Sequence, residues 1–256
     1  MDAPAKNLAD ICYKRNFLTS VIFRIDFVTP VEAIAAGLPA ALEGNILKLF
    51  PIPEPKKQKQ QEIQIGHPGP AVAREIEKIE WNFHSADRTR TIAITPECFW
   101  MSCSSYKSYA AFRDNLAQAT GFLFQAYPDI KIKRTGLRYI NDVRDVAETP
   151  IQWKGIIDDT LLCTLSFSLD GGEFARVFHN VEFAFERHNL RFLFGIHNQH
   201  YPAPVRERSF ILDYDAYRQG FNEPSDLLGL VDTLHSCIQG AFEKSITKGL
   251  RENLDA

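Results

Sequence analysis

The sequence predicts an α+β fold in which an antiparallel β-sheet, or a pair of such sheets, carries helices packed on one face. Apolar and polar residues alternate in many short segments, as in strands with one buried face. In two longer segments, apolar residues recur every three or four positions, as on the buried side of a helix. Short turns join the strands of the second half, so we expect these strands to pair antiparallel.

The chain is expected to begin with a strand followed by a helix. Residues 17–27 alternate between apolar and polar side chains. Thr29-Pro30-Val31-Glu32 combines an N-cap threonine, a proline at the first helical position and a glutamate three residues after the cap, which is the capping-box pattern. We therefore expect a helix toward Leu42, kinked or split at Pro39, whose nitrogen has no hydrogen to donate.

Composition changes abruptly in residues 51–70. Prolines and a Lys/Gln run fill this segment, PIPEPKKQKQQEIQIGHPGP, and leave little apolar surface to bury. We predict an exposed Pro/Lys/Gln-rich loop, with at most a short strand at 62–65. Such a loop is either a plain surface segment or a segment that binds a partner, and the sequence is compatible with both.

The remaining strands and helices follow from the same two periodicities. Strands are expected at 79–84, 92–94, 99–103, 130–143, 161–169, 177–185, 190–196 and 210–214. Helices are expected at 108–127, which Pro128 ends, and from Ser225 onward, with Ser225 as the N-cap. The resulting order is β-α-ββ-α-β, then a β-meander and a C-terminal helix.

This order describes a single α+β domain over residues 1–256. Runs of strands followed by a helix occur twice, so the order is also compatible with two closely packed halves, 1–128 and 129–256. A diverged duplication would explain such halves, although the residues themselves show no repeat.

Composition and charge narrow the class of protein. Hydrophobic residues make up 45% and charged residues 24% of the chain, values typical of globular proteins. The net charge of −3 disfavours binding to duplex DNA, which selects basic proteins. No apolar run is long enough for a signal peptide or a membrane span, and the five cysteines show no CxxC spacing. We therefore expect a cytoplasmic protein without disulfide bonds or a membrane partner.

The segment 132–141, IKRTGLRYIN, is the most distinctive motif of the chain. Together with residues 16–27, the strand around Trp81, and residues 104–112 and 212–217, it resembles a sporadically distributed bacterial family of uncharacterised proteins of about this length, marked by a GLRYIN strand. The resemblance implies a cytoplasmic prokaryotic protein encoded at mobile or defence-related loci. It implies no established reaction and no cofactor, so no catalytic residue is carried over.

The GLRYIN strand supplies the candidate binding residues. Alternate residues of an extended strand face opposite sides, so Gly136 and Arg138 share a side with Arg134. The two arginines lie ~13 Å apart along the strand, too far for one phosphate but suited to an extended ligand. The five candidates are Arg134, Gly136, Arg138, Tyr139 and Asn141.

Arg138 has two interpretations. We expect it to lie flat against the bare backbone of Gly136 and to pair with Asp142 or Asp26. Such a half-buried ion pair would hold the scaffold together. The alternative is a pocket for an anion or a peptide carboxylate, with the two arginines of the strand as its forks.

No constellation of residues predicts catalysis, a metal site or a cofactor. The patterns GxxxxGK[ST], GxGxxG and GxSxG are absent. Asp213 and Asp215 share a strand face that could hold a cation, but such residues more often begin a turn. No Cys or carboxylate lies at a familiar ligand spacing from His179, His188, His197 or His200.

Three functions are compatible with these observations. We expect a non-enzymatic protein-binding or assembly module that offers a sheet edge and residues 51–70 to a protein partner or to a second copy of the chain. The alternative is a small-ligand or anion sensor, or an enzyme, with a pocket near Arg138. A second alternative is single-stranded nucleic-acid binding by the basic strand around Lys131, Lys133 and Tyr139. The acidic net charge weighs against nucleic acid.

Overall fold

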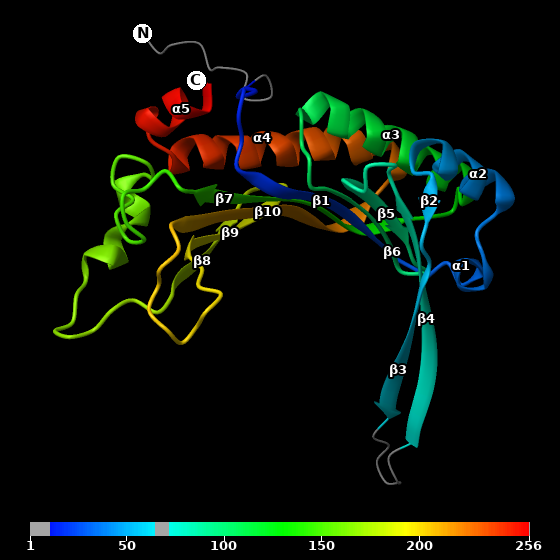
Figure 1. Ribbon diagram of the computed structural model, residues 1–256. Coiled ribbons are helices and arrows are strands. Elements are labelled where there is room, and N and C mark those ends of the chain that lie inside the picture. Colours follow the sequence, from blue (N-terminus) through cyan, green and yellow to red (C-terminus); the bar gives the residue numbers. More distant parts are fainter. Residues whose placement is uncertain (1–10, 65–71, 256) are drawn as a thin grey trace.

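The computed structural model describes residues 11–64 and 72–255, and only the backbone within residues 58–77. Its centre is a ten-stranded antiparallel sheet with helices on one face (Figure 1). This is the α+β class that the sequence predicts.

The elements fall into two consecutive sets. The first contains β1 (Leu18–Phe27), α1 (Ala33–Ala36), α2 (Ala40–Leu49), β2 (Ile52–Pro53), β3 (Lys56–Gln64), β4 (Val72–His84), β5 (Arg90–Ile94), β6 (Cys98–Cys103) and α3 (Tyr109–Ala126). The second contains β7 (Ile132–Arg144), the 3₁₀ helices η2 (Asp159–Leu161) and η3 (Cys163–Ser166), β8 (Val177–Ala184), β9 (Asn189–Ile196), β10 (Ser209–Asn222), the 3₁₀ helix η4 (Pro224–Asp226), α4 (Leu227–Ser245) and α5 (Lys248–Asp255).

The sheet is arranged around one central pair of strands. The strands follow the order β2-β4-β5-β6-β1-β7-β10-β9-β8, and β3 pairs with β4. β1 and β7 are antiparallel neighbours, and each is followed outward by strands of its own half. In each half, the described elements follow one order: a strand, a long connection, antiparallel strands and a helix. The origin of the halves by duplication stays a prediction.

The core lies between the sheet and helices α2, α3 and α4 (Figure 1). In β1, the buried Val21, Phe23 and Ile25 point into this layer, and the residues between them point away from it. The middle of the opposite sheet face has no covering helix in the described residues (Figure 1). Each long helix buries a stripe of apolar side chains, which are Phe112, Leu116, Ala119 and Leu123 in α3 and Leu227, Val231, Leu234 and Ile238 in α4.

Among the helices of the described ranges, none combines the length and the apolar character needed to cross a bilayer.

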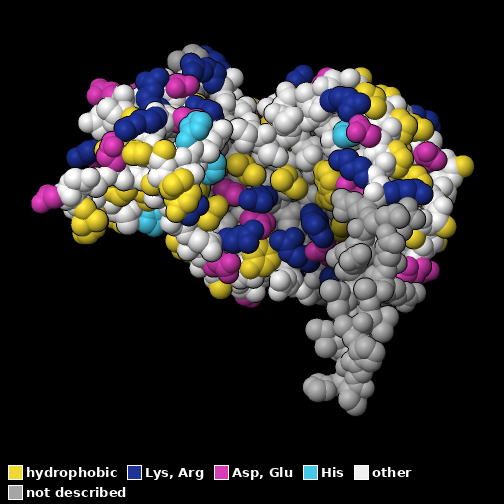
Figure 2. Space-filling model, turned by 60° about the horizontal axis from the view of Figure 1, so that its bottom comes forward, with side chains coloured by type: hydrophobic (Ala, Val, Ile, Leu, Met, Phe, Trp, Pro, Cys, Tyr) yellow, Lys and Arg dark blue, Asp and Glu magenta, His cyan; other side chains and the backbone are white. Residues whose placement is uncertain are grey.

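Two parts of the chain project beyond the sheet and border its open face. β3 and β4 extend away from the sheet as a two-stranded arm, on the side opposite the helices (Figure 1). At the other end, the segment 145–176 and the loop 197–208 project past the strands (Figure 1). The face between these projections is hollowed (Figure 2).

The segment 51–70 is not the loop that its composition predicted. Its described part forms β2 and β3, and the end of the strand expected at 62–65 falls among residues 65–71, which lie outside the described residues. β3 pairs with β4 in continuous register over its whole length. A polar segment can form a strand when a neighbouring strand supplies its backbone hydrogen bonds, and composition does not reveal that neighbour.

The strand predicted at 161–169 is also wrong. Residues of this segment form η2 and η3, and Phe167 and Leu169 are 66% and 67% exposed. Alternation produces a strand only where another strand lies alongside, and here the chain runs past the end of the sheet.

Helix starts differ from the predicted caps at two places. Thr29 does not cap α1, because the Val31 amide donates instead to the carbonyl of Pro96. Ser225 lies inside η4 and does not cap α4. Pro39 separates α1 from α2, as expected.

Gly195 lies in β9 where β8 passes closest. Its φ of 141° favours glycine, and a Cβ there would meet the Val177 carbonyl oxygen at 2.1 Å. We predict that Gly195→Ala lowers the free energy of unfolding by at least about 1 kcal/mol in urea denaturation. Gly121→Ala in α3 is the matched control and should raise stability, because a Cβ there meets nothing within 4 Å. Equal losses in both variants would contradict the packing of β8 on β9.

Candidate functional site

Strand β7 contributes its candidate residues to two different places. Arg134, Gly136 and Arg138 lie on the open face of the sheet. Tyr139 and Asn141 are buried under the helices, each 4% exposed. The strand therefore presents two faces, as its alternation predicts, and the five candidates do not form one site.

Arg138 binds Asp213 of β10 through two hydrogen bonds from one edge of its guanidinium group. Nε donates to Oδ1 at 2.8 Å and Nη2 donates to Oδ2 at 2.5 Å. The side chain of Asp213 is 7% exposed and that of Arg138 is 38% exposed, so the carboxylate is buried and the guanidinium group meets solvent. The hydrogen bonds to Asp213 raise the pKa of Arg138, which keeps the guanidinium group charged.

Both partners predicted for Arg138 were wrong. Asp26 and Asp142 bind arginines of their own strands instead. The register of β7 against β10 determines the actual pairing, because it places Arg138 directly opposite Asp215 and diagonal to Asp213.

The arginine that lies against the bare backbone of Gly136 is Arg134, not Arg138. A Cβ at Gly136 would stand 2.9 Å from Arg134 Nη1, so the glycine leaves room for the guanidinium group. Arg134 also lies over the ring of Tyr217, 5.1 Å from its centroid. The register pairs Tyr217 with Gly136, so ring, glycine and guanidinium group occupy neighbouring positions. The glycine therefore marks a close approach, as predicted, but by a different arginine.

Asp215 joins Arg134 to Arg191 of β9. Its Oδ2 lies 3.6 Å from Arg134 Nη2 and accepts a hydrogen bond from Arg191 Nη2 at 2.9 Å. The Asp215 side chain is 11% exposed and that of Arg191 is 45% exposed. Figure 2 shows basic and acidic side chains interleaved across this hollowed part of the surface. The carboxylates of Asp213 and Asp215 are thus buried, whereas Arg134, Arg138 and Arg191, which they hold, are 26%, 38% and 45% exposed.

A hollow of about 220 Å³ lies between Arg138 and Arg191. Asn180 of β8 and Leu193 of β9 complete its lining with Asp213. The sequence predicted that the two arginines of β7 would line an anion pocket. In the structure, Arg138 lines the hollow together with Arg191 instead. Sequence spacing could not reveal Arg191. β9 lies near β7 only because β10 lies between the two strands and pairs with both. Two guanidinium groups at one hollow can bind a carboxylate or a phosphate group.

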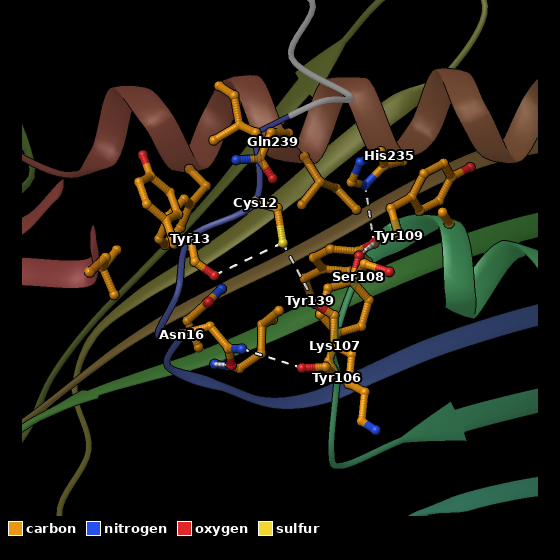
Figure 3. A pocket seen from close by; sticks show the side chains of 17 residues that line it. Cys12, Tyr13, Asn16, Tyr106, Lys107, Ser108, Tyr109, Tyr139, His235 and Gln239 are labelled. Atoms are coloured by element: carbon orange, nitrogen blue, oxygen red, sulfur yellow. Dashed lines mark hydrogen bonds between the residues drawn. The ribbon is translucent and has the colours of Figure 1, made fainter. Parts of the chain in front are cut away.

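A second cavity, of about 150 Å³, lies on the other side of β7, between the sheet and helices α3 and α4 (Figure 3). Tyr139 and Asn141 line it from β7. The segment before β1, the segment that leads into α3, and helices α4 and α5 supply the rest of the wall. The buried candidates of the GLRYIN strand therefore belong to this cavity and not to the open face.

A chain of polar contacts runs along the wall of this cavity (Figure 3). The Tyr139 hydroxyl lies 3.0 Å from His235 Nδ1 and 3.2 Å from the Tyr106 hydroxyl. The ring of Tyr109 stacks on His235 with centroids 3.7 Å apart. The Tyr109 hydroxyl in turn donates to Asp232 at 2.6 Å. These contacts join β7, the start of α3 and α4.

Burial keeps the imidazole of His235 and the phenol groups of Tyr139 and Tyr106 uncharged at neutral pH. Burial lowers the pKa of His235 to about 4, although Asp232 opposes the shift. Burial is also the main reason why the pKa of Tyr139 lies well above its ordinary value. The same cause raises the pKa of Tyr106 to about 12. The wall therefore presents a neutral imidazole and phenol hydroxyls.

Sequence reasoning missed Tyr106, Tyr109 and His235. His235 follows Leu234 in the buried stripe of α4, and a polar residue in such a stripe requires a partner. The two tyrosines belong to residues 104–112, a block of the family resemblance. The sequence therefore indicates that these polar residues are buried. It does not indicate that they lie beside Tyr139, because they are far from it along the chain.

The side chains considered as metal ligands have other partners. Asp213 and Asp215 accept hydrogen bonds from arginines. His179 stacks on Phe194 with centroids 4.8 Å apart. Within residues 11–64 and 72–255, no three His, Cys, Asp or Glu side chains gather in a way that could hold a metal ion.

Removal of the Arg138 guanidinium group leaves the buried carboxylate of Asp213 without its partner. We predict that Arg138→Gln lowers the free energy of unfolding by about 1–3 kcal/mol in urea denaturation, a range that allows for the partial exposure of Arg138. Arg206→Gln is the matched control and should have little effect, because Arg206 and Glu173 are 68% and 58% exposed. A loss of the same size in the control would contradict the importance of the buried carboxylate.

His235 should make the fold less stable in acid. An unfolded histidine binds a proton near pH 6.5, whereas the pKa of His235 in the fold is about 4. Between these values the unfolded state binds more protons, so a falling pH favours unfolding by up to roughly 3 kcal/mol. His235→Gln should lose this part of the pH dependence, and His200→Gln, with a 73% exposed side chain, should keep it. Identical pH profiles for wild type and His235→Gln in urea denaturation would contradict a neutral, buried His235.

Comparison with known proteins assigns no family to the chain: no family model matches it, and no curated protein matches it. The family resemblance of the GLRYIN strand therefore stays a prediction. What the two sites can bind has to follow from their own residues.

Proposed function

We propose that this protein is a non-enzymatic binding module that receives an acidic segment of a protein partner on the open face of its sheet. The observation that carries the proposal is the hollow between Arg138 and Arg191, where buried carboxylates hold two guanidinium groups beside an uncovered surface. The β3–β4 arm and the segment 145–176 border this face (Figure 1). An extended segment laid across the face would lie between these borders.

The exposure of the charged groups favours an acidic partner. Asp213 and Asp215 are 7% and 11% exposed, so their carboxylates contribute little to the surface. Arg138 and Arg191 are 38% and 45% exposed, so a partner meets N–H donors first. A guanidinium group has five such donors and can bind a second carboxylate while it keeps the first.

The same ion pairs favour recognition over catalysis. The oxygens of Asp213 and Asp215 accept hydrogen bonds from arginines, which limits their use as bases toward a substrate. Arginine keeps its proton at physiological pH. The open face therefore offers fixed charges that bind, rather than groups that take up and release protons.

Two other functions would use the same surface. A small anion could occupy the hollow of about 220 Å³ alone, which is the sensor or enzyme alternative near Arg138. Single-stranded nucleic acid is the other alternative, and the net charge of −3 weighs against it. The proposal places the protein in a mobile or defence-related system of the prokaryotic cytoplasm, in keeping with the family resemblance.

Arg191→Gln tests the proposal with the ion-pair network largely intact, because Asp215 keeps Arg134 as a partner. With a fluorescent oligo-glutamate peptide as the probe, we predict an affinity about tenfold lower than that of the wild type, measured by fluorescence anisotropy. Arg88→Gln is the matched control, since Arg88 lies in the turn between β4 and β5 and its contact with Glu54 is exposed. It should bind the peptide as the wild type does.

Unchanged affinity in Arg191→Gln, or an equal loss in Arg88→Gln, would contradict the proposal. Pyrophosphate that binds as tightly as the peptide would favour the small-anion alternative. Tighter binding of an oligothymidylate, with an affinity that falls steeply as salt increases, would favour nucleic acid.

A further inference from the structure

We infer that the cavity beneath helices α3 and α4 is a binding site for a small, uncharged, ring-shaped molecule that carries one hydroxyl group. The cavity lies on the side of β7 opposite to the proposed partner surface, so the inference does not rest on that proposal. It has a volume of about 150 Å³. Cys12 lines the cavity and is exposed among the described residues (Figure 3).

The volume sets the size of the ligand. An apolar protein cavity of about 150 Å³ holds one benzene molecule. The cavity here, also about 150 Å³, therefore suits a single six-membered ring with a small substituent. A nucleotide or a peptide segment would extend beyond it.

Aromatic and aliphatic side chains form most of the wall. Tyr106, Tyr109 and Tyr139 contribute aromatic rings (Figure 3). Tyr106 and Tyr139 meet edge to face with centroids 5.6 Å apart. Ile238 and Phe242 of α4 add apolar surface. A further ring can pack against such a wall in the same edge-to-face or offset geometry.

The wall favours a neutral ligand. Of the described residues that line the cavity, none is an aspartate or a glutamate. The lowered pKa of His235 keeps its imidazole neutral at physiological pH. Lys107 is the lysine among these residues, and its side chain extends away from the other labelled side chains (Figure 3). A charged ligand would lose its hydration here without gaining a counter-ion.

Two polar atoms of the wall match a hydroxyl group. Ser108 Oγ accepts a hydrogen bond from the Ala111 amide at the start of α3, which leaves the hydroxyl hydrogen of Ser108 to donate. Gln239 Nε2 donates to Glu243, which leaves the Gln239 amide oxygen to accept. Within the described part of the chain, these two groups have no other hydrogen-bond partner. A phenol or an alicyclic alcohol can donate its hydroxyl hydrogen to the Gln239 amide oxygen and accept from the Ser108 hydroxyl.

The probe for this site is p-cresol, with benzoate and benzylammonium as charged molecules of similar size. We expect p-cresol to bind the full-length chain in isothermal titration calorimetry, and both charged probes to bind at least about tenfold more weakly. Absence of p-cresol binding, or equal affinity for benzoate, would overturn the inference.

Cys12→Phe locates the bound probe. A phenylalanine at this position fills the cavity, so we expect the variant to lose p-cresol binding. Cys163→Phe is the matched control, because Cys163 is also exposed but does not line the cavity, and it should bind p-cresol as the wild type does. Undiminished binding by Cys12→Phe would place the probe elsewhere and overturn the inference.

Gln239→Leu provides a second measurement that does not depend on filling the cavity. It removes the amide oxygen, so the affinity for p-cresol should fall while the affinity for toluene stays unchanged. Equal changes for the two probes would contradict the hydroxyl contact. Arg191→Gln should leave p-cresol binding unchanged, which distinguishes a failure of this site from a failure of the proposed partner surface.

Discussion

The pairing of β7 with its neighbours in the middle of the sheet is the constraint on which the rest of the structure depends. The register against β10 places Arg138 opposite Asp215. The next position places Tyr139 opposite Tyr214. A slip of one residue would exchange the two faces of β7 and bury its arginines under the helices. The ion pairs of the open face and the contact of Tyr139 with His235 therefore require the same single register.

The two faces use polar groups in opposite ways. On the open face, buried carboxylates orient guanidinium groups that stay charged and reach solvent. Donors that are already oriented lose less conformational freedom when a partner binds. Beneath the helices, hydroxyls and an imidazole satisfy one another without charge, and the space beside them is enclosed mainly by apolar side chains. One strand thus separates the charged surface that we propose for partner binding from a mainly apolar cavity.

Local patterns were sufficient for much of the fold but for little of the sites. The alternation of β1 and the stripe of α3 predicted both elements to within a few residues. The described part of the segment 51–70 forms strands because β4 lies beside it. The segment 161–169 forms none because none of the described strands lies beside it. The contacts of Arg138 with Asp213 and of Tyr139 with the helices depend on strand order and register, which arise only when distant segments pack together.

Two double-mutant cycles test the separation of the two faces most directly. Arg138→Gln is combined with Asp213→Asn in one cycle and with Tyr139→Phe in the other, and unfolding free energies are measured in urea. We predict a coupling energy of at least about 1 kcal/mol between Arg138 and Asp213, and one within about 0.5 kcal/mol of zero between Arg138 and its chain neighbour Tyr139. Equal coupling in the two cycles would mean that both faces of β7 belong to one site, and would contradict this account.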